Sequence, residues 1–408
     1  MFRAAAPLLW IVCVPYSKIV RIKPKSFSQM PSSSSIRDTN KLVGLEVIRF
    51  ISALAVLFWH YQHFWFVGDH PVDFVRESQP LYSHFSVFYD YGFYGVQVFW
   101  CLSGFIFFWK YRQSIDAGSI GASRFFLLRF SRLYPLHVIT LLLVAALQIG
   151  YYNQQGYYFV YQANDLKHFL LQFLLASHWG FQAGYSFNGP IWSISVEVAA
   201  YVVFFLLLRH VGRSVLVNLA VLVAYAVAKW AHVPSQIVDC IAFFYAGGLS
   251  AIAFGNWRNS EHQAKLNSLL LAFLVLTPLA VYGRVPNTEP VVHLFLLLWL
   301  PPMLLLCARK LSVPARLQSM MEAAGNMTYS SYLIHFPIQL ALAWYFAAVG
   351  KPIPYHSTKL FLLFMGLTML SAYFIYRLFE LPVQNLIRGQ FDGASAERTV
   401  LGAAAARQ

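Results

Sequence analysis

Charged residues are scarce in this sequence, and their scarcity excludes an ordinary soluble domain. Asp, Glu, Lys and Arg make up 11% of its 408 residues, whereas about a quarter of a typical soluble domain is charged. Hydrophobic residues make up 58% and aromatic residues 17%. The composition therefore predicts an all-α polytopic membrane protein that lies in the lipid bilayer.

Acidic residues are fewer still, 16 against 30 Lys and Arg, which gives a formal net charge of +14. The basic residues are scattered in short loops between apolar runs and are not gathered in one polar domain. This distribution is typical of topology signals, so we expect no nucleic-acid partner.

Cysteine is rare, and its four positions lie far apart in apolar stretches: Cys13, Cys101, Cys240 and Cys307. Without a ligand-spaced set, neither a disulfide framework nor a zinc site is expected. His60 and His63 could face one way on a helix, but no carboxylate stands beside them. The sequence therefore predicts no metal site.

The apolar runs predict about ten transmembrane helices. They lie near residues 44–66, 87–109, 133–150, 191–208, 215–230, 236–254, 267–283, 291–308, 328–348 and 359–379. With this count the basic pairs Arg209 and Arg213, and Arg258 and Lys265, fall in cytoplasmic loops, which predicts cytoplasmic N- and C-termini.

Three regions follow from this pattern. Residues 1–43 are basic and serine-rich and are expected to form a disordered cytoplasmic extension, and residues 389–408 a disordered tail. Residues 44–388 form the membrane domain. We expect a multi-pass protein of the cell's inner (plasma) membrane.

The first apolar run carries three ionisable residues, Glu46, Arg49 and His60. Arg49 and His60 are eleven positions apart, about 16 Å along a helix and on nearly the same face. Glu46 can pair with Arg49 three residues later. Arg49 could instead snorkel to the head groups and His60 could be a satisfied core residue, but ionisable groups at such depth mark functional sites by default.

Two further stretches could bind or position a substrate. Arg129 and Arg132 share a helical face at the cytoplasmic side, and paired guanidinium groups bind phosphate well. The excess of basic residues that cytoplasmic loops usually carry would explain the two arginines equally. The stretch 186–198 contains Asn188, Trp192, Ser193 and Glu197. Asn188 suits a turn and Trp192 an interfacial belt, whereas Glu197 needs a partner, for which His60 is a candidate.

Two other motifs are weaker alone. Ser103 and Gly104 in the second run would let helices approach closely. His335, in the stretch Tyr329-Ser-Ser-Tyr-Leu-Ile-His335, lies inside the ninth run.

Taken together, these motifs resemble the acyltransferase 3 family of integral membrane acyltransferases. The resemblance rests on Arg49 with His60, Arg129 with Arg132, Phe99-Trp-Cys-Leu-Ser-Gly-Phe105, Trp192-Ser-Ile-Ser-Val-Glu197 and Tyr332-Leu-Ile-His335. It extends from about residue 42 to about residue 388. Where the family commonly has Asp-Gly-Leu-Arg, this chain has Glu46-Val-Ile-Arg49, which keeps the charge and the spacing.

The resemblance implies transfer of an acyl group, usually acetyl, from a cytoplasmic acyl-CoA to a hydroxyl of a carbohydrate or glycolipid acceptor. Arg129 and Arg132 would bind the acetyl-CoA phosphates, Arg49 would orient the donor or a partner carboxylate, and His60 would be the general base, oriented by Glu197. Ser103, Asn188, Trp192, Ser193 and His335 would support the site, with Glu46.

Three alternatives stay open at this stage. A secondary transporter or proton-coupled channel also uses intramembrane Arg, His and Glu, although the repeated halves of many transporters are not found here. The donor could be succinyl-CoA or a longer acyl-CoA. The acceptor, and whether the acyl group pauses on a protein side chain, are not readable from the residues.

Overall fold

The computed structural model describes residues 42–257, 261–281, 283–285, 288–309, 311 and 313–391. All of them belong to the unit that begins at Leu42. Residues 1–41 of the expected extension and 392–408 of the expected tail lie outside the described residues. The expected bounds of both regions are slightly too wide, because Val43 already belongs to the first helix and residues 389–391 are helical.

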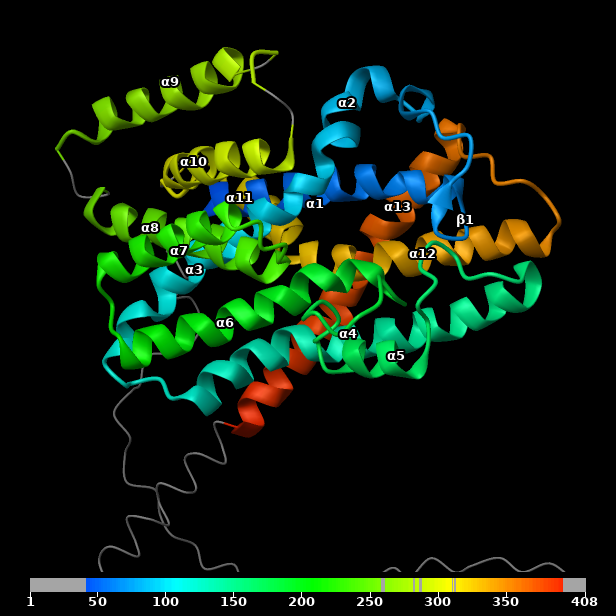
Figure 1. Cartoon of the computed structure of the whole chain (residues 1–408), viewed down its shortest axis with the longest axis horizontal. Helices are drawn as coiled ribbons and strands as arrows, with labels where there is room; N and C mark the ends of the chain where they lie inside the picture. Colours follow the sequence, from blue (N-terminus) through cyan, green and yellow to red (C-terminus); the bar gives the residue numbers. More distant parts are fainter. Residues whose placement is uncertain are drawn as a thin grey trace, which may run out of the picture. The chain divides into compact units, whose positions relative to one another are not determined.

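Thirteen α-helices account for most of the described residues (Figure 1). They are α1 (Val43–His60), α2 (Tyr82–Tyr91), α3 (Gly95–Asp116), α4 (Ala122–Gln155), α5 (Leu166–Phe173), α6 (Trp192–His210), α7 (Val215–Trp230), α8 (Gln236–Trp257), α9 (Gln263–Val281), α10 (Glu289–Cys307), α11 (Ala315–Asn326), α12 (Thr328–Ala348) and α13 (Thr358–Ile375).

Short elements complete the fold. The 3-10 turns are η1 (Tyr61–Trp65), η2 (Arg76–Ser78), η3 (Gly92–Tyr94) and η4 (Gly189–Ile191), and η5 (Tyr376–Glu380) is a π-turn that continues α13. Strands β1 (Phe66–Val67) and β2 (His70–Pro71) form one antiparallel hairpin after η1. The all-α membrane fold that the composition predicts is confirmed.

Eight helical segments of the described residues are long and apolar enough to cross a bilayer. Two predicted runs are not among these eight segments. Helix α7 covers the run at 215–230 but has only 16 residues, and α12, with 21 residues, covers the run at 328–348. The expected count of ten spans therefore stays a prediction, as does the side on which the termini lie.

The observed helices differ from the predicted runs in several places, since α2 and α11 begin in segments expected to be loops, and two further differences concern the site. Helix α4 begins at Ala122, about two turns before Arg129, so the basic segment is already helical. The long polar segment after α4 contains a short helix, α5. Asp165 caps α5 by accepting the backbone N–H of His168, which explains why a helix starts in this polar segment.

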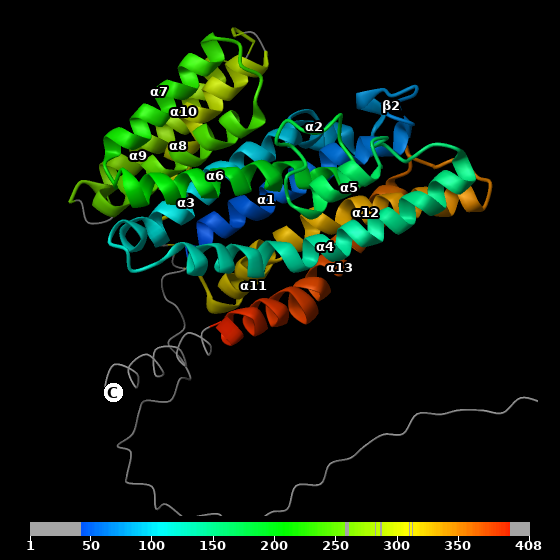
Figure 2. The ribbon, with the colours of Figure 1, turned by 60° about the horizontal axis from the view of Figure 1, so that its bottom comes forward.

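Helix α1 lies inside the bundle, and the other helices pack around it (Figure 2). It contacts α3, α10, α11 and α12, while α12 packs against α4 and α13. Helices α7, α9 and α10 gather with α8 at one end (Figure 2). Arg49, Ser52 and His60 of α1 are buried, so these polar residues face protein and not lipid, whereas Ile51 on the same helix is exposed.

The contact between α3 and α8 depends on two glycines. A Cβ at Gly104 would lie 1.8 Å from the Phe244 carbonyl oxygen, and one at Gly247 would lie 1.8 Å from the Cys101 carbonyl oxygen. Any side chain at either position would therefore push the two backbones apart. The close approach predicted at Gly104 is confirmed.

Candidate functional site

Arg49 and His60 both lie on α1, as the first apolar run predicts. Both are buried, with 8% and 6% of their surface exposed. Neither residue therefore extends to the head groups, and each needs polar contacts inside the protein.

Arg49 is held by Glu46. Its Nη1 donates to Glu46 Oε2 over 2.5 Å, so the predicted i, i+3 ion pair is formed. The glutamate in turn packs against Gly325 of α11, where a Cβ would lie 2.1 Å from Oε2 and 2.7 Å from Glu46 Cβ. The orientation of Arg49 thus depends on how closely α11 approaches α1.

A first cavity of about 130 Å³ opens beside Arg49, and we call it the arginine cavity. Its polar lining comes from α1, α3, α4, α6 and α12 and includes Arg49, Ser103, Arg129, Arg132, Ser193, Glu197 and Tyr332. Three guanidinium groups face one carboxylate there, so the cavity has an excess of positive charge. Such a lining suits an anionic ligand, above all a phosphate-bearing one.

Arg129 is fixed in place from two sides. Its Nη2 donates to the Tyr111 hydroxyl over 2.7 Å, and its Cζ lies 4.7 Å from the centre of the Phe107 ring. A further arginine, Arg388, reaches the same stretch of α4 and donates to Ser131 Oγ over 3.2 Å. Sequence reasoning missed Arg388, because nothing in the chain after the last span indicates which helix it contacts.

Glu197 faces the arginines and does not pair with His60. The hydroxyl of Tyr201 donates to its Oε1 over 2.7 Å, and the carboxylate lies in the arginine cavity. Trp192, at the start of α6, is the residue that reaches the cavity of His60, and Glu197 is about 7 Å further along the helix. Among the described residues the expected pair of Glu197 with His60 is therefore not formed, and that expectation is wrong.

His60 lines a second cavity of about 470 Å³, which we call the histidine cavity. Its lining is largely aromatic and includes Trp59, His60, His63, Tyr161, Tyr185, Trp192 and Tyr332. Part of it comes from the long segment between α4 and α6, at residues 160–163 and 183–185. Aromatic walls with a few polar groups are typical of a binding site for an organic ligand.

The imidazole of His60 has one defined hydrogen bond. Its Nδ1 lies 2.8 Å from the Val56 carbonyl oxygen, and since a carbonyl only accepts, Nδ1 carries the proton. The other ring nitrogen, Nε2, is therefore left with its lone pair. The backbone of α1 thus orients His60, which is the role that the sequence had assigned to Glu197.

Two more histidines contact His60. Its ring centre lies 5.0 Å from that of His63 and 4.8 Å from that of His335. His335 is fully buried, and neither of its ring nitrogens has a hydrogen-bond partner among the described residues. The structure therefore brings His335 of α12, which the sequence placed among the supporting residues, into contact with His60, and the sequence did not predict this contact.

Tyr332 is the residue that lines both cavities. Its hydroxyl donates to the Pro190 carbonyl over 2.8 Å and lies 2.7 Å from Ser193 Oγ. Next to it, Asn188 Nδ2 donates to the Leu333 carbonyl over 3.0 Å. Asn188 and Ser193 therefore fasten the start of α6 to α12, at the boundary between the arginine cavity and the histidine cavity.

The fold and these cavities define a polytopic membrane protein with a buried polar site between its helices. Residues 42–377 match the model of the acyltransferase 3 family, described as an acyltransferase domain. The match spans most of the chain, so the protein belongs to this family and is a membrane acyltransferase. No curated protein and no solved structure matches the chain.

Proposed function

We propose that this protein transfers an acetyl group from cytoplasmic acetyl-CoA to a hydroxyl of a carbohydrate or glycolipid acceptor in the inner (plasma) membrane. The observation that carries the proposal is that a positively charged cavity and an aromatic cavity containing His60 share the side chain of Tyr332. The family assignment favours this function over the transporter that the sequence alone left open.

The arginine cavity is assigned to the donor. Arg129 and Arg132 lie on one face of α4, where their planar guanidinium groups can each donate two hydrogen bonds to a phosphate. Arg49 lines the same cavity and is fixed by Glu46, so it adds a third positive charge for the nucleotide end of the donor. Glu197 then serves to align the arginines.

The histidine cavity is assigned to the acceptor. Trp59, Tyr161, Tyr185 and Trp192 offer ring faces on which the C–H faces of a sugar can stack. His60 Nε2 takes the proton of the acceptor hydroxyl while the oxygen attacks the thioester carbonyl. The C–S bond then breaks, the protonated imidazole returns its proton to the CoA sulfur, and the products are the acetyl ester and CoA.

This reaction requires the bound donor to extend along α1 from the Arg49 end to His60. Arg49 and His60 are separated by about 16 Å of helix rise. The narrow arm that links the nucleotide of CoA to its thioester has to span this distance past Tyr332. The arrangement therefore favours a donor that enters at the Arg49 end and an acceptor that enters at the His60 end.

Labelling tests the proposal directly. Membranes that contain the wild-type chain, His60→Ala or the control His84→Ala, at matched levels, are incubated with radiolabelled acetyl-CoA and, in parallel, succinyl-CoA. The products are identified by mass spectrometry of glycans and glycolipids. His84 is an exposed histidine of α2, so its variant controls for loss of an imidazole as such.

Loss of the general base should lower the rate by about 10²- to 10⁴-fold. Wild type and His84→Ala should label one acceptor species and His60→Ala should not. Equal labelling by His60→Ala and wild type would show that His60 is structural. A labelled product that is not a carbohydrate or glycolipid would contradict the acceptor assignment.

A further inference from the structure

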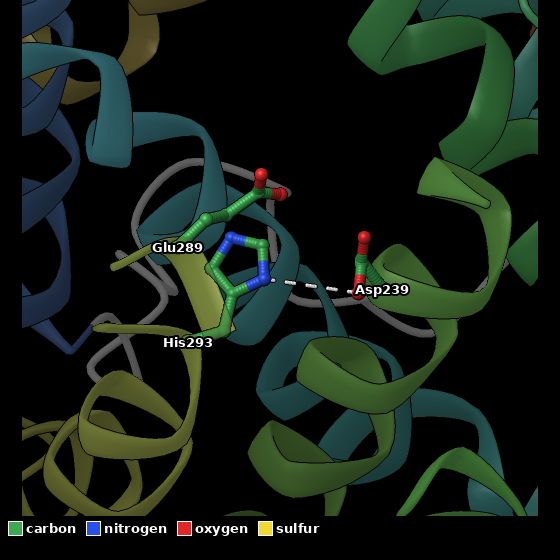
Figure 3. Close-up of side chains that lie close together, drawn as sticks. All are labelled: Asp239, Glu289 and His293. Carbon is green, nitrogen blue, oxygen red and sulfur yellow. Dashed lines mark ion pairs between the residues drawn. The ribbon is translucent and has the colours of Figure 1, made fainter. Parts of the chain in front are cut away.

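Three side chains with metal-binding atoms converge where α8 and α10 begin. Asp239 lies in the first turn of α8, and Glu289 and His293 lie on one face of α10, four residues apart. One ligand atom from each lies within 4.8 Å of the other two. Figure 3 shows the imidazole of His293 close to both carboxylates, with Glu289 above the ring and Asp239 to its right.

His293 has a free ring nitrogen inside this group. The residue is 3% exposed, its Nδ1 has no hydrogen-bond partner, and Nδ1 faces Asp239 Oδ1 at 3.8 Å, the pair joined by the dashed line in Figure 3. A buried polar atom without a partner costs free energy, so this nitrogen needs a ligand.

The second ring nitrogen of His293, Nε2, also has a neighbour that suits metal binding at Nδ1. His293 Nε2 lies 3.2 Å from the side-chain amide of Gln97, whose Oε1 has no partner. Since the two ends of an amide are interchangeable by rotation, Gln97 can present Oε1 and accept the proton of Nε2. Metal-binding histidines commonly donate their second N–H to such an oxygen, which leaves the lone pair on Nδ1.

We propose that Asp239, Glu289 and His293 form a binding site for a divalent metal ion, with zinc as the preferred ion. One imidazole and two carboxylates are a ligand set that zinc accepts, and a water molecule completes the tetrahedron. Glu289 is exposed, so its side chain is free to close the group around the ion from solvent. The proposal is independent of the acyl transfer proposed above.

Lys229 gives this site a distinctive property. Its Nζ lies 2.7 Å from Asp239 Oδ1, so the lysine is a tethered cation that competes with the metal for the same carboxylate. A purely structural ion pair would need Lys229, whereas a metal site is weakened by it. Removal of the lysine charge thus separates the two interpretations.

The test is zinc binding by the purified full chain in detergent, measured by competition with a chromophoric chelator. Wild type should bind one zinc ion that raises the thermal unfolding midpoint, because a ligand that binds only the folded state stabilises it. Glu289→Gln and His293→Gln should each weaken binding by at least about tenfold. The control His84→Gln should bind as wild type does.

Lys229→Met should tighten zinc binding by about tenfold, since a positive charge about 4 Å from the ion is removed. Glu289 is exposed, so its variant keeps the fold even if a buried substitution does not. Unchanged affinity in Glu289→Gln would refute the site. Weaker zinc binding in a folded Lys229→Met protein would refute the competition and support a structural ion pair.

Discussion

Replacement of Gly325 by alanine should damage the site without touching a residue that lines either cavity. The new Cβ would lie 2.1 Å from Glu46 Oε2 and 2.7 Å from Glu46 Cβ. Rotation of the carboxylate relieves the first contact but not the second, because Cβ is fixed to the backbone. Helix α11 must therefore move away from α1, and the ion pair between Glu46 and Arg49 is lost.

The size of the effect follows from two terms. Overpacking a tight contact costs about 1–3 kcal/mol, and loss of a hydrogen bond to a charged group costs about 1.5–3 kcal/mol. Gly325→Ala should therefore lower the free energy of unfolding by roughly 2.5–6 kcal/mol. If the lost hydrogen bond, and not the overpacking, also destabilises the transition state by about 1.5–3 kcal/mol, kcat/KM for acetyl-CoA should fall by about 10- to 150-fold.

The measurements are the thermal midpoint of the detergent-solubilised protein and kcat/KM for acetyl-CoA. Gly366→Ala is the matched control, because it is also a helical glycine but its Cβ would meet no atom within 4 Å. In a double variant, Gly325→Ala with Glu46→Gln, the two losses of activity should not add, since both remove one interaction. Wild-type stability and activity in Gly325→Ala, or full additivity, would refute the reasoning.

Three further substitutions have defined outcomes. Arg129→Lys should raise KM for acetyl-CoA about tenfold, because lysine replaces neither the planar fork nor the stacking on Phe107; an unchanged KM would exclude Arg129 from the donor site. Tyr332→Phe keeps the ring but loses about 1 kcal/mol for each of two buried hydrogen bonds, so the thermal midpoint should fall, and an unaltered midpoint would contradict this. Hydrogen bonds from the backbone N–H and the ring of His168 lower the pKa of Asp165. Their stabilisation is therefore present above the ordinary pKa of an aspartate, about 3.9, and is lost as pH falls through the lowered pKa. Amide exchange in α5 should accelerate in that acid range in wild type, whereas Asp165→Ala, which has no oxygen to accept from the His168 backbone N–H, should exchange fast already at neutral pH.

Much of the fold could be predicted from composition and local pattern. Apolar runs with few charges identified the helices, and the spacing of Glu46, Arg49 and His60 placed them on one helix, since a fixed rise and turn per residue decide which side chains share a face. The helix ends were predicted less accurately than the helices themselves. The apolar run placed the start of the third span near residue 133, whereas α4 begins at Ala122, because contacts with neighbouring helices, and not hydropathy, fix that end.

Contacts between helices could not be predicted in the same way. The sequence paired Glu197 with His60 because both are ionisable and lie in apolar runs, but the packing of α6 places Glu197 with the arginines. The sequence also predicted no metal site, and the site proposed here depends on a contact between two helices. The i, i+4 pair of Glu289 and His293 was a signal in the sequence that could have been noticed, although its third member, Asp239, lies fifty residues away on another helix.

The sequence by itself determined that this is a helical membrane protein of the acyltransferase 3 family and which helices carry its ionisable residues. Hydropathy and helical spacing are local properties, so they can be read from the chain. Only the tertiary structure decided that the arginines and His60 line two cavities that share Tyr332, and that His335 lies beside His60. The depth and rotation at which helices pack set these neighbours, and they depend on close contacts such as those at Gly104 and Gly325 that no single segment specifies.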